Sequence, residues 1–148
     1  SMQRGATSTM VFGVAHLVFN MLGVFVVGSR LEPRVSSTLI VILCLFAALV
    51  SNVSQFVLGS PAYFGGMSGV FLALIGCAFV WQLLRPGTEI GLPRAFYWLC
   101  IAVTFLGFTG MLDALAGARI ANWSHLGGLL SGMLVGLVSA SGAAIFRR

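Results

Sequence analysis

A serine and a histidine lie on separate apolar segments of this chain of 148 residues, and together they carry the groups that serine nucleophile chemistry needs. Ser68 follows an uncharged glycine-rich run and begins a strongly apolar stretch, and His125 lies on a second such stretch. A serine hydroxyl becomes a good nucleophile only when a base takes its proton, and histidine does this near neutral pH. We therefore predict that Ser68 is a nucleophile and that His125 is its general base.

Attack on a carbonyl creates an oxyanion, which preorganised hydrogen-bond donors must stabilise. Ser68 is expected to begin a helix, so its backbone N–H lacks a partner inside that helix. His16 and Asn20 are four residues apart and share one helix face, from which both side chains can donate. These groups are the predicted oxyanion hole. Asp113 is an alternative partner for orienting His125, but a Ser–His dyad without a carboxylate is the preferred interpretation.

The composition predicts that these residues lie in a membrane. The chain is 59% hydrophobic and 7% charged, whereas a soluble domain of this length carries far more surface charge. Long apolar runs separated by short Arg-bearing loops indicate membrane-spanning helices of about 20 residues each. We predict an all-α, polytopic transmembrane bundle in which residues 1–148 form a single domain. Its five helices are expected at about residues 9–28, 37–58, 67–84, 94–112 and 122–145.

The charges predict the orientation of this bundle. All 8 basic residues are Arg, and 6 of them lie in the loops after the first and third predicted helices or at the C-terminus. If the helices alternate in direction, these three sites share one side of the membrane, which the positive-inside rule places in the cytoplasm. Ser68 then lies near the extracytoplasmic side. The uncharged loop from Gly59 to Gly66 is expected to dip into the bilayer.

Other partners follow from the same pattern. The Arg residues are spread over loops and ends, so nucleic acid is not an expected partner, whereas the lipid bilayer is. The absence of Lys beside abundant Gly, Ala and Arg is typical of a GC-rich bacterial gene, which points to a bacterial plasma membrane. The three cysteines lie singly in apolar runs without metal-type spacing, so no metal is expected. No oligomeric state follows from the sequence.

Small residues at four-residue spacing predict which helices meet. Gly69 and Ala73 lie on the third predicted helix, and Gly128 and Gly132 lie on the fifth. Such stripes let two backbones approach closely in lipid. We predict that these four residues pack the two helices together, with the nucleophile and the base at the same end of the contact.

Three short motifs occur in order along these predicted helices. They are His16-Leu17-Val18-Phe19-Asn20, Gly66-Met67-Ser68-Gly69 and Ser124-His125-Leu126-Gly127-Gly128, with Gly132 four residues on. Together they resemble the rhomboid intramembrane serine proteases, over roughly residues 7–140. The resemblance implies that Ser68 is the nucleophile, that His125 is the general base, and that His16 and Asn20 line the oxyanion hole with the Ser68 N–H. It also implies a cofactor-free endopeptidase that cleaves transmembrane protein substrates in or near a membrane-spanning segment.

The chain departs from the rhomboid pattern at three points. The family core has six helices, and the five predicted here lack the first. Leu72 stands where many bacterial members carry a Tyr packed on the catalytic His, and Ser124 stands where Ala is frequent. A non-catalytic rhomboid-like protein that binds or escorts transmembrane clients is therefore an alternative function. A small transporter or channel subunit is a third, which the scarcity of charge in the predicted helices disfavours.

Overall fold

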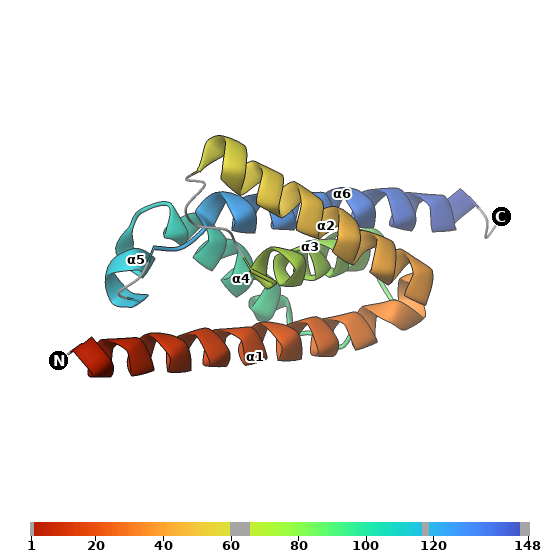
Figure 1. Ribbon diagram of the computed structural model, residues 1–148. Helices are drawn as coiled ribbons and strands as arrows, with labels where there is room; N and C mark the ends of the chain where they lie inside the picture. The colour runs from red at the N-terminus through yellow and green to blue at the C-terminus, as the bar shows by residue number, and fades with distance from the viewer. Residues whose placement is uncertain (1, 60–65, 117–118, 146–148) are drawn as a thin grey trace.

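The computed structural model describes residues 2–59, 66–116 and 119–145, and these residues form six α-helices without any strand (Figure 1). Five of these helices correspond to the five predicted ones, which confirms an all-α helix bundle. The helices are α1 (Met2–Val35), α2 (Ser37–Leu58), α3 (Ser68–Leu84), α4 (Arg94–Gly107), α5 (Met111–Ala116) and α6 (Asn122–Ile145).

The first helix is longer than predicted at both ends. It continues past residue 28 to Val35, so Arg30 and Arg34 lie in its last turns and not in a loop. Arg, Leu and Glu favour helix in this stretch, and Pro33 lies too near the end to break more than the last turn. A single residue, Ser36, then separates α1 from α2, and its hydroxyl accepts a hydrogen bond from the third residue of α2.

The prediction of one helix over residues 94–112 is wrong at its C-terminal end. Helix α4 stops at Gly107, and the short α5 begins at Met111 after a turn. Gly110 in this turn has a φ of 75°, a conformation that glycine adopts freely and other residues rarely do. The predicted re-entrant loop falls mostly on residues 60–65, which lie outside the described part of the chain.

Three helices of the described chain are long and apolar enough to cross a membrane: Gly13–Val35 within α1, α2, and Asn122–Gly142 within α6. The other two predicted spans are shorter. Helix α3, expected at about 67–84, has 17 residues, near the lower limit for a span, whereas α4 has only 14 and is shorter than predicted. Helix α3 is the most enclosed, with almost all of its first eleven residues buried. Large apolar side chains of α1 and α2, such as Phe25 and Leu45, point outward, as lipid-facing residues do.

Helix α3 lies at the centre of the bundle and makes its most extensive contact with α6. A Cβ atom added at Gly128 would come within 3.0 Å of the backbone of Gly69, and one added at Gly132 would come equally close to the backbone of Ala73. The two backbones therefore touch along the predicted stripes, and only glycine fits at these two positions of α6. Because residue numbers rise together along the contact, α3 and α6 run parallel.

Helix α1 packs on another side of α3, also in parallel (Figure 1). A Cβ atom added at Gly23 would lie 2.8 Å from the ring of Phe71, and one added at Gly28 would lie 4.0 Å from a methyl carbon of Leu74. Counting back one turn from the Gly23–Phe71 contact places residue 20 of α1 at the level of residue 68 of α3.

Arginine side chains bind the opposite end of the bundle together. Arg85 donates to the backbone oxygen of Ala140 through Nε (3.1 Å) and Nη2 (2.8 Å) and so joins the end of α3 to α6. Arg34 donates to the backbone oxygen of Glu89 at 2.7 Å, and Arg30 donates to that of Gly91. The last turns of α1 therefore hold the connection between α3 and α4.

Candidate active site

The structure brings Ser68 and His125 together at the N-terminal ends of the two parallel helices. Nε2 of His125 lies 2.9 Å from Oγ of Ser68, which is hydrogen-bond distance. Ser68 is the first residue of α3 and is buried, and His125 lies in the first turns of α6. When Nε2 is unprotonated, the Ser68 hydroxyl donates to it, which is the arrangement that lets a base remove the hydroxyl proton.

The backbone N–H of Ser68 has no acceptor within its own helix. The first hydrogen bond of α3 runs from Phe71 N to the backbone oxygen of Met67 (2.9 Å). The N–H groups of the helix residues before Phe71 therefore have no acceptor within the helix. Met67, which precedes the helix, makes no side-chain cap. This end of α3 therefore presents the Ser68 N–H and the positive end of the helix dipole beside the Ser68 hydroxyl.

The two predicted side chains of the oxyanion hole differ in burial. Asn20 is buried at the level of Ser68, on the face of α1 that packs toward α3. Its Nδ2 donates to the backbone oxygen of His16 at 2.9 Å, so an oxyanion would compete with that carbonyl for the donor. The His16 side chain lies one turn further toward the N-terminus and is exposed.

Helix α2 contributes two polar residues that the sequence analysis missed. Gln55 is buried, and its Oε1 accepts a hydrogen bond from the backbone N of Ser124 (3.2 Å), the residue before His125. Ser51, one turn earlier on α2, is buried beside Gly69. The four-residue spacing of a Ser and a Gln on a mainly apolar helix was the available signal, because buried polar groups at membrane depth face other helices.

Asp113 has a structural partner that explains its position without His125. Its Oδ1 accepts a hydrogen bond from the backbone N of Ile120 at 2.9 Å and so joins α5 to the segment that leads into α6. Among the described residues, the only hydrogen bond of the His125 ring is the one to Ser68. Within the part of the chain that the structure describes, the His125 ring therefore pairs with Ser68 and with no carboxylate.

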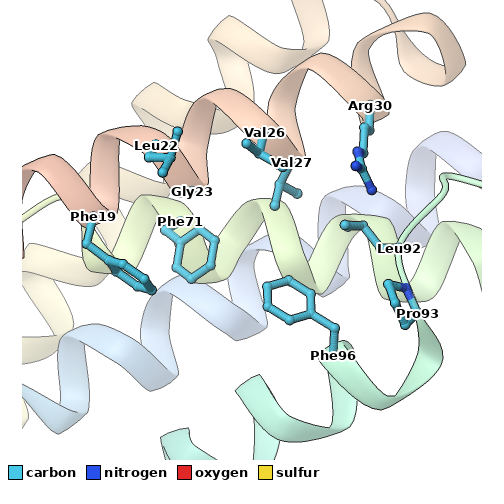
Figure 2. A pocket seen from close by; sticks show the side chains of 10 residues that line it. All are labelled: Phe19, Leu22, Gly23, Val26, Val27, Arg30, Phe71, Leu92, Pro93 and Phe96. Atoms are coloured by element: carbon cyan, nitrogen blue, oxygen red, sulfur yellow. The ribbon is translucent and has the colours of Figure 1, made fainter.

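An apolar groove of about 340 Å³ runs between α1, α3 and α4 (Figure 2). Phe19 and Phe71 line one end, and Phe96 of α4 faces them from across the groove. Of the described residues that line the groove, only Arg30 is charged, and it lies at the far end, beside Leu92. Neither Ser68 nor His125 lines this groove, but Phe71 at its end lies one turn along α3 from Ser68.

Comparison with known proteins identifies the family of this chain. A model of the Rhomboid domain matches residues 3–142 of the chain. The chain belongs to the rhomboid family. It is 34% identical over 124 residues to the Rhomboid protease GlpG of Yersinia pestis (strain Pestoides F), an alignment that covers 84% of this chain and 43% of that relative. It is 31% identical over 131 residues to the Rhomboid protease GlpG of Photorhabdus laumondii subsp. laumondii, covering 85% and 43%.

Membership of the rhomboid family, together with the apolar helices, makes this an integral membrane protein. The chain spans less than half the length of the relatives named above. The family model covers all six helices of the structure apart from Met2 at the start of α1 and the last three residues of α6, so both members of the Ser–His pair fall within the matched region.

Proposed function

We propose that this rhomboid chain carries the catalytic dyad of an intramembrane serine endopeptidase, with Ser68 as nucleophile and His125 as general base. The observation that carries the proposal is the 2.9 Å separation of Ser68 Oγ and His125 Nε2 at the ends of two helices in backbone contact. Names of the relatives add support, since those proteins are called rhomboid proteases. Neither a metal nor a cofactor is required by this chemistry.

The proposed reaction follows from the groups around Ser68. Its Oγ attacks the carbonyl carbon of the scissile peptide, while its proton passes to Nε2 of His125. The resulting oxyanion binds the Ser68 N–H and the side chains of Asn20 and His16. His125 then gives the proton to the leaving amine nitrogen as the C–N bond breaks. Water deprotonated by His125 hydrolyses the acyl-enzyme and regenerates the hydroxyl of Ser68.

Transmembrane proteins are the proposed substrates, because the groove beside α3 is apolar over almost its whole length. In an α-helix each carbonyl oxygen accepts a hydrogen bond within the helix and side chains surround the backbone, so a folded helix offers its peptide bonds poorly to Ser68. We therefore propose that a locally unwound, extended stretch of the substrate reaches Ser68. Small residues and helix-breaking residues near the scissile bond would favour that extension.

The dyad is tested by covalent labelling with a fluorophosphonate in detergent micelles. We expect the unaltered chain to be labelled and Ser68→Ala to be unlabelled, and His125→Ala to be labelled far more slowly because the base is gone. Ser139→Ala is the matched control, since this serine of α6 only donates to the backbone oxygen of Gly136 (3.2 Å). Equal labelling of Ser68→Ala and the unaltered chain would rule out the assigned nucleophile. A chain that binds transmembrane clients but is neither labelled nor able to cleave them would favour the non-catalytic alternative.

We further propose that residues 1–148 act as one domain in a bacterial plasma membrane, with the dyad near the extracytoplasmic side. The orientation rests on the Arg residues at the opposite end of the bundle, where Arg30, Arg34 and Arg85 lie. Ala114→Cys, on α5, and Glu89→Cys, between α3 and α4, test it in intact cells, each in a background in which Cys44, Cys77 and Cys100 are replaced by Ser. A membrane-impermeant maleimide should label the cysteine at 114 and spare the one at 89, and the reverse pattern would invert the proposed topology.

A further inference from the structure

The end of α4 is attached to the start of α6 by two neighbouring contacts. Asn122, the first residue of α6, donates from Nδ2 to the backbone oxygen of Gly107, the last residue of α4, at 2.9 Å. Beside this hydrogen bond, the rings of Phe108 and Trp123 meet edge to face with centroids 5.0 Å apart. His125 follows Asn122 by three residues, so both contacts act on the helical turn that carries the proposed base.

This turn of α6 needs such contacts because helix ends are the least stable part of a helix. The first N–H groups of a helix have no partner within it, and terminal turns fray when nothing else holds them. In the structure, Gln55 of α2 accepts from Ser124 N, Asp113 of α5 accepts from Ile120 N, and Asn122 reaches α4. Three other helices therefore hold the start of α6, each through one side-chain hydrogen bond.

From this geometry we infer that Asn122 is a positioning residue for His125, an inference that rests on the proposed function. The His125 ring makes no hydrogen bond to a carboxylate in the described part of the chain, so its place depends on the backbone beneath it. Asn122 fixes that backbone against the end of α4. When the link is lost, the first turn of α6 moves more freely, and His125 spends less time at hydrogen-bond distance from Ser68.

The link can be broken from either partner. Asn122→Ala removes the donor. Gly107→Ala displaces the donor, because a Cβ atom at Gly107 would come within 3.0 Å of Asn122 Oδ1 and the amide would have to move away. If both substitutions act through this one link, the double variant should be no slower than either single variant. Asn52→Ala is the matched control, because Asn52 also donates from Nδ2 to a backbone oxygen, that of Ala48 (2.7 Å), but within its own helix.

The main readout is the second-order rate of fluorophosphonate labelling at Ser68, since this small probe reports the dyad without requiring a substrate helix to enter. We expect Asn122→Ala, Gly107→Ala and the double variant to be slower by about the same factor, roughly fivefold, the equivalent of one hydrogen bond. Cleavage of a transmembrane substrate should lose kcat by the same factor with KM unchanged. Unchanged labelling, a change confined to KM, or an additive loss in the double variant would overturn the inference.

Hydrogen exchange gives a second readout that does not depend on activity. The backbone amides of residues 123–126 should exchange faster in Asn122→Ala and Gly107→Ala than in Asn52→Ala or the unaltered chain. Faster exchange with loss of labelling supports the inference, and unchanged exchange overturns it. If Ser68→Ala is labelled as well as the unaltered chain, the proposed nucleophile fails instead, and the exchange rates still decide whether Asn122 fixes this turn.

Discussion

Gly132 of α6 offers the sharpest test of how the two helices that carry the proposed dyad are held together. A Cβ atom at this position would lie 2.5 Å from the carbonyl carbon of Ala73 and 2.6 Å from its Cα, and closer still to its oxygen. All three atoms belong to the backbone of α3, which is enclosed on nearly every side and has no room to move away. Gly132→Ala must therefore push α6 away from α3.

The magnitude follows from two opposing effects. Overpacking a well-packed contact typically costs about 1–3 kcal/mol, and clashes with backbone atoms place Gly132→Ala at the upper end. Alanine is favoured over glycine within a helix by about 1 kcal/mol, which offsets part of that cost. We expect a net loss of about 2 kcal/mol in the free energy of unfolding, equivalent to a roughly thirtyfold smaller ratio of folded to unfolded protein.

Gly142→Ala is the matched control, because Gly142 lies on the same helix with no atom within 4 Å of an added Cβ. It should leave the free energy of unfolding unchanged or raise it by up to about 1 kcal/mol. Both variants can be compared by reversible unfolding in mixed micelles, followed by circular dichroism at increasing fractions of denaturing detergent. If Gly132→Ala proved as stable as Gly142→Ala, the backbone contact between α3 and α6 would not be the one that holds the bundle.

Two further predictions concern polar side chains. Asn20→Ala should lower kcat for a transmembrane substrate by about 10²–10³-fold, as loss of an oxyanion-hole donor does, while the free energy of unfolding changes far less. A kcat within twofold of that of the unaltered chain would remove Asn20 from the proposed site. Arg85→Gln should lower the free energy of unfolding by about 2 kcal/mol, because the two charge-assisted hydrogen bonds from Arg85 to Ala140 are lost. The exposed Arg94 should tolerate the same change, and equal stability of the two variants would contradict the proposed role of Arg85.

Much of the bundle could be predicted because membranes restrict the choice of structure. Apolar runs in a chain this poor in charge must form helices, since lipid offers no partner to exposed backbone groups. The contact between α3 and α6 was equally predictable, because glycine at positions 128 and 132 has little purpose on a lipid-facing surface. The separation of Ser68 from His125 could not be predicted to the ångström, although the parallel stripes required both residues to lie at the same end of the contact.

Other features could not be predicted from the sequence, because they depend on contacts between segments that are distant along the chain. Asn122 and Gly107 are 15 residues apart, and Gln55 and Ser124 are 69 residues apart, so no local pattern links either pair. The break between α4 and α5 was missed because the apolar run continues through Gly110, whose positive φ is a property of the backbone and not of hydropathy. Asp113 was a possible partner of His125 in the sequence, but a carboxylate can equally accept from a backbone N–H, and Asp113 accepts from that of Ile120.

A dyad without a carboxylate changes which parts of a fold must be rigid. In a triad the third residue holds the imidazole directly, so the helix beneath it can tolerate some motion. In the described residues the His125 ring makes one hydrogen bond, to Ser68, and the first turn of α6 sets its orientation. That turn would fray on its own, and three hydrogen bonds hold it in place. The Gln55 side chain of α2 accepts from its backbone, and the Asp113 side chain of α5 accepts from the segment just before it. Its own Asn122 side chain donates to the backbone of α4. Rigidity that a carboxylate would provide at the ring is thus supplied through the backbone, by residues that never touch the substrate.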